Sequence, residues 1–598
     1  MKKEFQTQRH TVDLCVVGGG LAGLCAAVAA ARGGSKVALI HDRPVLGGNA
    51  SSEIRMWVCG AAGENNRETG IIEEIELRSL YRNPDKNYSV WDSILYETAR
   101  FEPNITLLLN CSVFDAETDG SMIKSVTGWQ TTTQKFHTVS AKCFADCSGD
   151  SVLAPLTGAA YRAGREAAAE FGEKTSQKES DARTMGMSCL LQMRKTDRKS
   201  KFIPPEWAKK LTEEELRLRN PHMDSSGENF WYLELGGNRD TVGDTEDIRD
   251  ELLSLAWGMV DHVKNSGSVP DADYWELDWL GFLPGKRESR RMVGAYIMTQ
   301  NDVLAGGDFP DTVAYGGWAL DDHHPDGFYH AGNPNVWGET PSPYGIPYRC
   351  LYSANVGNLF FAGRNISVTH AAMSSTRVMA TCALLGQAVG EAANLARGNG
   401  LSPAGVYEKK IGELQQRLIE NGCFLPRFRR TVSPVCKKAR LVCEEEAPAN
   451  IDDLKNGVER NHRLYGEKDF RVSLPLGKRV SYVFAEPVTL ENVHIRFDAD
   501  LGRDTLPGDE IERKHTMRAN RTPGSPSTHL PETLVKSYSL SAETASGERI
   551  VFFETDCNLR GCVNHAAPEV PLRSVSLTVF GTWGGDGDHA CVFSFDVR

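Results

Sequence analysis

Three glycines near the start of the chain have the spacing of a phosphate-binding turn. Gly18, Gly20 and Gly23 form a Gly-x-Gly-x-x-Gly pattern between an apolar stretch at 12–17 and a run of small residues at 24–34. The pattern is informative where a buried strand precedes it and a helix follows, and both conditions are predicted here. It indicates a dinucleotide with its diphosphate at the helix N-terminus. The alternative is a glycine-rich turn in a plain α/β domain.

A second predicted strand, residues 36–40, is followed by two residues that could contact a ribose. A dinucleotide-binding domain places an acidic side chain about twenty residues beyond the glycine-rich turn, where it accepts hydrogen bonds from the ribose. Here His41 stands directly after the strand and Asp42 follows. We expect Asp42 to hold the ribose; the alternative is a solvent-facing Asp42 with His41 against the adenosine.

Two later segments indicate which dinucleotide binds. Strand-like residues from 105 to 145 end in the sequence FADCSGD (144–150), and residues 358–364 form a strand that enters a turn. A long helix rich in small residues is predicted over 374–396, and its small side chains would let it lie close to a neighbour. This arrangement resembles the glutathione-reductase-like FAD superfamily, in which a late strand and helix return to the first domain. There the helix N-terminus faces the flavin and favours the negative charge of its reduced form.

More narrowly, five segments are similar to the bacterial FAD-dependent oxidoreductase family. They are RPVLGGNASSEIR, FADCSGD, GKRESRRMVGAY, IPYRCL and NLFFAGRNISVTHAAMSSTRVMA, within residues 12–400. The resemblance implies bound FAD and a redox role. With the glycine-rich turn, it places the expected FAD contacts at Gly18, Gly20, Ala22, Gly23, Asp42, Arg43, Gly48, Asn49, Ser51, Val113, Gly149, Asp150, Gly363, Arg364, Thr376, Arg377 and Val378.

The loop after the second strand lacks the chemistry of the flavin disulfide reductases. In those enzymes two redox cysteines follow the Leu-Gly-Gly sequence, whereas Ala50 and Arg55 stand in this chain and the single Cys59 cannot form a dithiol. Thiol–disulfide exchange needs two thiols, so the loop is expected to hold FAD and line the pocket instead. What remains is direct hydride exchange between a substrate carbon and flavin N5.

Histidines near the expected flavin are candidates for the proton transfer that accompanies hydride removal from an alcohol. His370, between the late strand and helix, is the first choice for a base or substrate contact; the alternative is a structural histidine bonded to the backbone. His323 is the second choice, although its pairing with His324 is also typical of a polar loop over the pocket. No carboxylate–histidine set at helical spacing indicates a metal, so no metal site is predicted.

Arginines are further candidates for catalysis. Arg364 stands at the exit of the late strand, where it would contact flavin or substrate. Arg290 belongs to the charged run Arg287-Glu288-Ser289-Arg290-Arg291. An ion-pair cluster that ties domains together is slightly favoured for this run over a substrate clamp.

The chain is long enough for several domains, and we predict an α/β fold. A Rossmann-like, glutathione-reductase-type FAD-binding domain would comprise 1–160 and 346–400, interrupted by an inserted α+β substrate domain at 161–345. Residues 401–444 would form a helical connector. Short alternating strands in 445–598 indicate a β-sandwich that weakly resembles discoidin and galactose-binding modules.

Inside the predicted insert, residues 230–235 have the pattern of a strand, and apolar residues from Ile248 to Val263 recur at helical spacing. Tryptophans are frequent in this region. Most are expected in the core, although one or two could stack on sugar rings, because an aromatic face matches axial C–H groups.

Charge and composition restrict the partners. The formal net charge is 67 − 79 = −12, which argues against nucleic acid and anionic membranes as general partners. No segment approaches the ~18 apolar residues of a membrane helix. The 15 scattered cysteines fit reduced thiols and a cytoplasmic location. The expected partners are a small-molecule substrate, for which a sugar is one candidate, and an electron acceptor of open identity; a homo-oligomer also stays open.

Three functional hypotheses follow from the sequence. The first is an FAD enzyme that oxidises a secondary alcohol, with a sugar or glycoside as the favoured substrate. The second is a fumarate-reductase-like reduction of an activated C=C bond, with an arginine as the acid. The third is a carbohydrate-binding or scaffold protein that retains flavin for structure.

Overall fold

The computed structural model describes residues 5–223, 228–502, 517, 527–585 and 587–598. The chain folds into two compact units. The first unit comprises Met1–Ala61, Asp85–Ile411 and His515–Ser527, and the second comprises Ala62–Pro84, Gly412–Lys514 and Thr528–Arg598. The domain boundaries expected from the sequence stay predictions.

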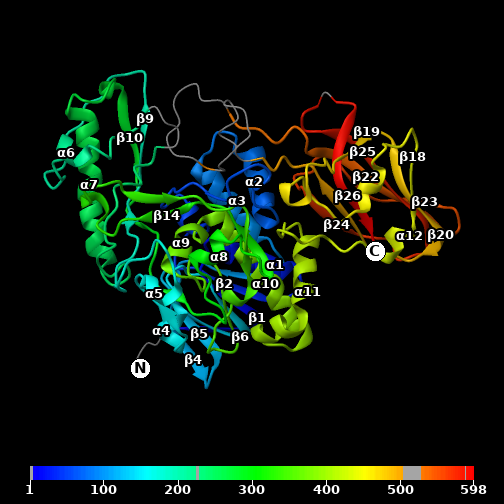
Figure 1. The fold of residues 1–598 in the computed structure, drawn as a ribbon, viewed down its shortest axis with the longest axis horizontal. Helices are drawn as coiled ribbons and strands as arrows, with labels where there is room; N and C mark the ends of the chain where they lie inside the picture. Colours follow the sequence, from blue (N-terminus) through cyan, green and yellow to red (C-terminus); the bar gives the residue numbers. More distant parts are fainter. Residues whose placement is uncertain (1–4, 224–227, 503–516, 518–526, 586) are drawn as a thin grey trace. The chain divides into compact units, whose positions relative to one another are not determined.

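A seven-stranded sheet organises the first unit (Figure 1). Its order is β3-β2-β1-β6-β5-β4, and β17 pairs with β6. The parallel strands are β1 (Thr7–Val17), β2 (Val37–Ile40), β3 (Ile105–Leu108), β6 (Lys135–Asp146) and β17 (Leu359–Phe361), while β4 (Cys111–Asp119) and β5 (Met122–Gln130) are antiparallel.

The register of this sheet brings four strand ends together. Val17 pairs with both Ile40 and Asp146, and Asp146 also pairs with Phe361. The carboxyl ends of β1, β2, β6 and β17 therefore meet at one edge, where open α/β sheets bind their ligands. The predicted strands at this edge are confirmed.

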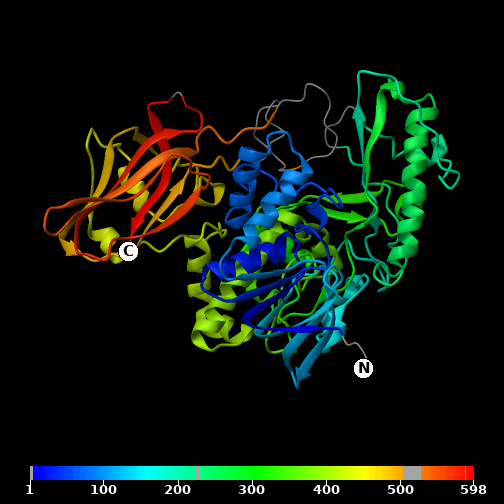
Figure 2. The same cartoon turned by 180° about the vertical axis from the view of Figure 1, so that it is seen from behind.

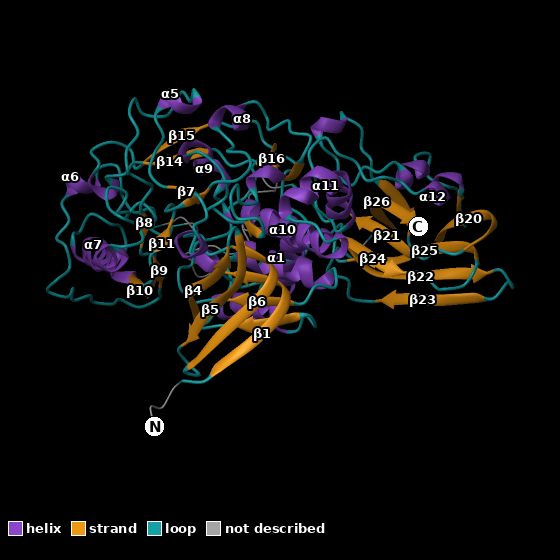
Figure 3. Ribbon diagram, turned by 90° about the horizontal axis from the view of Figure 1, so that it is seen from below, coloured by secondary structure: helices purple, strands orange, loops and turns teal. Residues whose placement is uncertain are grey.

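Two helices from opposite ends of the unit's sequence pack against each other at this edge. Helix α1 (Leu21–Arg32) contacts β1 and β2, and α10 (Met379–Asn399) contacts β6 and β17. Figure 3 shows α1 and α10 next to each other. A Cβ atom on Gly386 would lie 2.0 Å from the carbonyl oxygen of Ala22, and one on Gly390 would lie 2.4 Å from that of Ala26. The two backbones can approach this closely only because glycine has no side chain.

The single helix predicted over 374–396 is two helices, α9 (His370–Thr376) and α10. Val378 interrupts them with extended backbone angles, φ −67° and ψ 146°. The break creates a new helix N-terminus at Met379 that no side chain caps. This difference matters for the site, because uncapped helix N-termini carry free N–H groups.

The region between β6 and β17 contains a separate hydrophobic core around α7 (Thr245–Asn265). The predicted amphipathic helix is confirmed there, with Ile248, Leu252 and Met259 buried. The predicted strand over 230–235 is wrong: the segment is a turn, in which Phe230 adopts φ +57°, and Leu235 forms an isolated bridge. Its apolar side chains fill the core beneath α7, which explains the strand-like pattern.

Short elements complete the first unit. The helices are α3 (Tyr88–Arg100), α4 (Leu153–Thr157), α5 (Ala168–Phe171), α6 (Glu213–Leu216) and α8 (Gln300–Leu304). The strand pairs are β7 (Tyr161–Arg162) with β12 (Arg291–Met292), β8 (Met187–Ser188) with β11 (Gly285–Lys286), β9 (Leu191–Lys195) with β10 (Trp275–Leu280), β13 (Thr312–Gly316) with β16 (Tyr344–Pro347), and β14 (Leu320–His323) with β15 (Asn335–Gly338).

The second unit is a β-sandwich of two antiparallel sheets, drawn from yellow to red in Figure 2. One sheet has the order β18-β20-β25-β22-β23, and the other has the order β19-β26-β21-β24. Its strands are β18 (Arg440–Cys443), β19 (Val472–Pro475), β20 (Arg479–Val488), β21 (Asn492–Phe497), β22 (Val535–Thr544), β23 (Arg549–Thr555), β24 (Cys562–Ala566), β25 (Leu572–Thr582) and β26 (His589–Val597). The predicted sandwich is confirmed as an architecture.

Helix α2 (Ile71–Arg82) also belongs to the second unit, although the sequence analysis grouped it with the first 160 residues. Leu77 and Leu80 of α2 are buried in the sandwich core. The other helices are α11 (Pro403–Glu420), which contains the boundary between the units, and α12 (Pro434–Lys438). Among the described residues, no helix is long and apolar enough to cross a bilayer.

The contact between α1 and α10 predicts the effect of a small substitution. Gly386→Ala should lower the free energy of unfolding by about 1–3 kcal/mol, because the new methyl group would overlap the Ala22 carbonyl. Gly398→Ala in the same helix is the matched control, since its Cβ would meet nothing within 4 Å. Urea unfolding followed by circular dichroism measures both variants. Equal stability of the two would contradict the packing.

Candidate functional site

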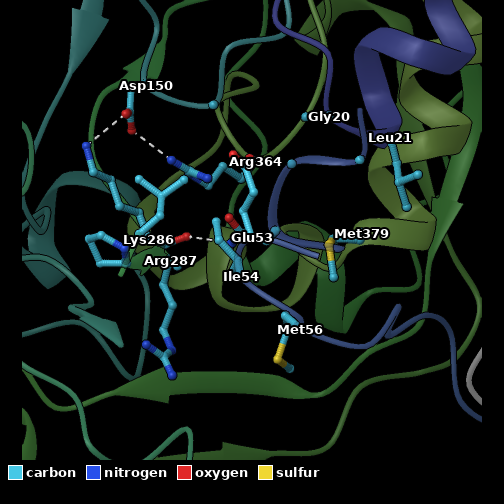
Figure 4. Close-up of a pocket in the computed structure, with 18 of the residues that line it drawn as sticks. Gly20, Leu21, Glu53, Ile54, Met56, Asp150, Lys286, Arg287, Arg364 and Met379 are labelled. Atoms are coloured by element: carbon cyan, nitrogen blue, oxygen red, sulfur yellow. Dashed lines mark hydrogen bonds and ion pairs between the residues drawn. The ribbon is translucent and has the colours of Figure 1, made fainter. Parts of the chain in front are cut away.

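A cavity of about 1080 Å³ lies in the first unit, at the carboxyl edge of the parallel strands. Its lining includes the Gly18–Gly20 turn, the loop at 47–49, the segment 147–150 and the first residues of α10. Figure 4 shows part of this wall. Ligand cavities typically measure roughly 300–1,000 Å³, so this one is large enough for an extended ligand with a second molecule beside it.

The glycine-rich turn has the geometry that its spacing predicts. Gly18 adopts φ +107°, and a Cβ atom there would lie 2.4 Å from the carbonyl carbon of Cys147. A Cβ on Gly23 would lie 1.8 Å from the oxygen of Gly18, so Gly23 serves helix packing and does not line the cavity. Gly20 differs, because its Cβ would meet only the Gly48 Cα, at 3.9 Å. Its open side is therefore free for a ligand against the backbone.

Polar side chains at the end of β2 surround the next part of the cavity. His41 is buried, and its Nδ1 accepts a hydrogen bond of 3.0 Å from the backbone N–H of Gly19. The opposite nitrogen, Nε2, is buried without a hydrogen-bond partner among the described residues. Asp42 lines the cavity beside it, and Arg43 Nη1 lies 3.7 Å from Glu53 Oε2.

Asp150 joins two cationic side chains across the cavity wall. Its carboxylate accepts hydrogen bonds from Arg364 Nη2 at 2.7 Å, Lys286 Nζ at 3.0 Å and Ser289 Oγ at 2.7 Å. Figure 4 shows both cationic side chains pointing at this carboxylate. Burial acts to raise the pKa of Asp150, but the charges of Arg364 and Lys286 and the hydrogen bond from Ser289 outweigh it and lower the pKa to about 2.

A second aspartate holds the segment that carries Asp150 in place through hydrogen bonds to its backbone. Asp146, at the end of β6, is completely buried and accepts hydrogen bonds from Ser148 N at 3.0 Å and Leu153 N at 2.8 Å. Asn365 donates to the same carboxylate at 3.3 Å. Because Asn365 directly follows Arg364, these bonds fix the relative positions of Asp150 and its arginine partner.

A histidine faces the cavity from hairpin strand β14. His323 Nδ1 lies 2.6 Å from Glu234 Oε2, while its Nε2 lies 3.4 Å from Asp321 Oδ2, at the outer limit of a hydrogen bond. Burial acts to raise the pKa of Glu234, but Arg287 and His323 lower it below its usual value. Glu234 is therefore a buried carboxylate that orients the imidazole.

Arginines and tryptophans complete this end of the cavity. Arg377 donates to Asp321 Oδ2 at 3.1 Å, and Arg287 donates to Ser188 Oγ at 3.0 Å and to the carbonyl of Trp231 at 3.0 Å. In Figure 4, Arg287 extends away from the Asp150 cluster. The aromatic lining consists of Trp57, Trp231, Trp279, Phe282, Trp318 and Trp337.

His370 and Arg290, two of the predicted catalytic residues, do not line the cavity. Both ring nitrogens of His370 are bonded to carboxylates, Nδ1 to Glu288 at 2.8 Å and Nε2 to Asp322 at 3.0 Å. Burial acts to lower the pKa of His370, but these carboxylates raise it to about 10. The histidine is thus held as a cation with no free nitrogen.

The charged run 287–291 divides between two environments. Glu288 and Arg291 are buried and paired with each other, and Arg291 also donates to Glu166 Oε1 at 2.7 Å. Arg290 donates to the Asp150 carbonyl at 3.5 Å and its guanidinium lies 5.7 Å from the Tyr161 ring centroid. Among the residues of the run, Arg287 lines the cavity.

The structure brings most of the predicted site residues to one cavity. Those that line it are Gly18, Gly20, Ala22, Asp42, Arg43, Gly48, Asn49, Val113, Gly149, Asp150, His323, Gly363, Arg364, Arg377 and Val378. Gly23, Ser51 and Thr376 do not line it. Ser51 donates to the carbonyl of Gly48 at 2.8 Å and so supports the loop, while Thr376 is buried in α9.

The sequence analysis missed the partners of the charged residues. Lys286 lies in a quoted motif, but its pairing with Asp150 joins residues 136 positions apart. Glu234 likewise reaches His323 from 89 positions away. The position of Asp321 could have been predicted from the sequence. It lies two residues before His323, and residues two apart on a strand point to the same face.

Comparison with known proteins identifies the family. The fold and the glycine-lined cavity define a dinucleotide-binding protein, and the model of the family described as "FAD dependent oxidoreductase" matches residues 13–418. The chain belongs to this family, and it is an enzyme with FAD as its cofactor. A search of curated protein sequences finds no match.

Solved structures similar to parts of the chain include a geranylgeranyl bacteriochlorophyll reductase-like protein from Thermoplasma acidophilum. It has 13% identity and a TM-score of 0.30, over 69% of this chain and 86% of that one. A family 32 carbohydrate-binding module of Streptococcus pneumoniae EndoD has 13% identity and a TM-score of 0.20, over 28% of this chain and 99% of that one. The family 32 module of C. perfringens NanJ, in complex with galactose, has 10% identity and a TM-score of 0.17, over 28% and 97%. At these TM-scores the likeness supports no inference about this chain.

The depressed pKa of Asp150 predicts how stability depends on pH. A carboxyl group with a folded-state pKa of about 2 and an ordinary value of 3.8 stabilises the fold above pH 3.8, and this contribution disappears as the pH falls toward 2. The shift corresponds to about 2 kcal/mol. Asp150→Asn should therefore be less stable than the wild type by about that amount at pH 7, and the difference should shrink in acid.

Urea unfolding at a series of pH values measures this difference. Asp119→Asn is the matched control, because Asp119 pairs with Lys124 at 3.1 Å but is largely exposed, so its loss should change stability little. A deficit of Asp150→Asn that is independent of pH would contradict the assignment.

Proposed function

We propose that this enzyme oxidises a secondary alcohol of a sugar or glycoside, with FAD bound along the cavity. The observation that carries the proposal is His323, a cavity-lining imidazole whose Nδ1 is fixed by buried Glu234. Glutathione-reductase-type topology of the FAD domain is part of the same proposal. Cytoplasmic location and oligomeric state stay predictions.

The residues of the cavity fit FAD. Gly20 has an open side, and the N-terminus of α1 directs N–H groups toward the place where a diphosphate would lie. His41 Nε2, Arg43 Nη1 and Arg364 Nε are buried without a hydrogen-bond partner among the described residues. Buried polar atoms are normally paired, so these atoms suit a polar ligand. The first turn of α10 would face the other end of the cofactor, the flavin ring.

FAD, when bound, supplies the acceptor for the hydride that leaves the substrate carbon. Nε2 of His323 would leave its 3.4 Å contact with Asp321 Oδ2 and take the proton of the substrate hydroxyl while the carbon–oxygen bond becomes a carbonyl. Glu234, bonded to Nδ1, would fix the tautomer and stabilise the imidazolium that forms. Hydride and proton together account for the two-electron oxidation.

The aromatic lining supports a sugar as the substrate class. Trp231 packs edge-on against His323, with ring centroids 5.3 Å apart, and Trp318 packs edge-on against Trp337 at 5.4 Å. Aromatic faces match the C–H groups of sugar rings, and the neighbouring Asp321 and Arg377 provide paired acceptors and donors for hydroxyl groups.

A second candidate is the reduction of an activated C=C bond, and the position of Arg287 favours it. This guanidinium lies in the cavity wall, and burial lowers its pKa despite the opposing charge of Glu234. A lowered pKa makes an arginine a better proton donor. In this reaction Arg287 would protonate the carbon that does not receive the hydride.

Anaerobic flavin absorbance distinguishes the two candidates. Sugars and glycosides should bleach the oxidised flavin of the wild type, whereas an enoate would reoxidise dithionite-reduced flavin in the second candidate.

His323→Ala should slow bleaching by about 10²–10⁴-fold without loss of flavin, because the base is removed. His370→Ala serves as the contrasting variant. It should lower thermal stability, since it removes the cation that bridges Glu288 and Asp322 and leaves Glu288 with Arg291 alone. Unchanged bleaching by His323→Ala would exclude it as the base.

Gly20→Val tests the position of the cofactor. The protein leaves room for a Cβ atom at this position, whose nearest neighbour would be the Gly48 Cα at 3.9 Å, and the branched side chain would compete with the diphosphate for the space beyond it. We expect a folded protein with little or no FAD, measured by absorbance after purification and by circular dichroism. A variant that retains full FAD would place the diphosphate elsewhere.

A further inference from the structure

One face of the β14–β15 hairpin forms part of the cavity wall. His323 on β14 pairs with Asn335 on β15. Two positions earlier on β14, Asp321 pairs with Trp337. Residues opposite each other on neighbouring strands point to the same face of the sheet, and all four of these side chains line the cavity. His323 and Trp337 are therefore diagonal neighbours on this face of the hairpin.

The exposure of the lining side chains shows where the cavity opens to solvent. His323 is buried, whereas Trp337 is 58% exposed although it lines the cavity. Phe282, in the loop that follows β10, also lines the cavity and is 61% exposed. Trp337 therefore stands at a mouth of the cavity, and the hairpin connects this mouth with the candidate base.

The indole of Trp337 is held in place without being covered. It packs edge-on against Trp318, with ring centroids 5.4 Å apart and 75° between the ring planes. The carbonyl of Trp318 accepts hydrogen bonds from Ser375 Oγ at 2.5 Å and from Thr340 Oγ1 at 2.9 Å, which fix its backbone. An edge-on contact covers at most one face of a ring, so Trp337 offers open aromatic surface whose position is already set.

Polar side chains lie between His323 and Trp337. Asn335 Nδ2 and Arg377 Nη2 both donate to the carboxylate of Asp321. Each of these nitrogens carries a second hydrogen, and the carboxylate has further lone pairs, so the cluster can both donate to hydroxyl groups and accept from them. Such a cluster suits the hydroxyl groups near a glycosidic bond, with one ring on either side.

We propose that the cavity contains a second subsite, at Trp337, for the ring that is linked to the oxidised sugar. The proposal rests on the sugar oxidation proposed above and specifies its substrate as a glycoside with at least two rings. Diagonal neighbours on adjacent strands are roughly 7–8 Å apart, a separation that two directly linked rings can span. The outer ring stacks an apolar face on Trp337 while the inner ring places its hydroxyl group at His323. A second sugar and an aromatic aglycone both have such a face.

Calorimetric titration of the FAD-loaded full chain tests this subsite. The flavin is first reduced anaerobically with dithionite, so that it cannot accept a hydride and binding is measured without turnover. The glucose ligands are methyl β-glucoside, phenyl β-glucoside and cellobiose, and the galactose ligands are methyl β-galactoside, phenyl β-galactoside and lactose. The phenyl glycosides and the disaccharides distinguish an aromatic aglycone from a second sugar.

In at least one of the two sets, a two-ring ligand should bind more tightly than the methyl glycoside. Trp337→Ala should weaken binding of that ligand by about three- to tenfold and leave binding of the methyl glycoside unchanged, because only the outer ring contacts the indole. Trp337→Phe, which keeps an aromatic face, should recover part of the lost affinity.

Val336→Ala is the matched control, because Val336 precedes Trp337 on β15, is 67% exposed and does not line the cavity. It should bind every ligand like the wild type. Circular dichroism and flavin content report whether each variant is folded. The proposal is overturned if no two-ring ligand binds more tightly than its methyl glycoside, if Trp337→Ala weakens binding of the methyl glycosides equally, or if Val336→Ala causes the same loss.

The subsite and the proposed reaction can fail separately. Two-ring ligands that bind through Trp337 but do not bleach the oxidised flavin would support the subsite and contradict the sugar oxidation. Methyl glycosides that bleach the flavin and bind as tightly as the two-ring ligands would support the oxidation and contradict the subsite.

Discussion

Helices α1 and α10 touch through their backbones, because Gly386 and Gly390 have no side chains to separate them from Ala22 and Ala26. This contact joins segments that are more than 350 residues apart in the sequence. It places the N-termini of both helices in the wall of one cavity. The partial positive charges at the two helix N-termini are therefore positioned in the cavity wall by a packing contact between uncharged glycine and alanine residues.

Buried charges hold the elements on the far side of the cavity. Glu288, Arg291 and Glu166 form a chain of ion pairs that continues through His370 to Asp322. Unpaired charges at this depth would be strongly destabilising, so the members must be kept or lost together. His370 stands between the late strand and helix, as the sequence suggested. Both of its ring nitrogens, however, are taken up by this chain of ion pairs.

Strand alternation decides which polar residues of β14 face the cavity. Asp321 and His323 line it, whereas Asp322 between them bonds to His370 on the other side. His324 lies beyond the strand, in the turn with Asp326 and His330. One short strand thus contributes both to the cavity and to the buried charge network.

The sequence by itself determined the local parts of this protein. The strand, glycine turn and helix around Gly18–Gly23 depend on neighbouring residues, and so do the alternating strands of the sandwich. The absence of a redox dithiol in the loop was equally readable, because it depends on residue identity alone. The tertiary structure decided the rest, including the break at Val378, the membership of α2 in the second unit and the fact that His323 lines the cavity while His370 does not. These features depend on partners far away in the chain, such as Glu234 for His323, and hydrophobic periodicity carries no information about which distant side chain completes a pair.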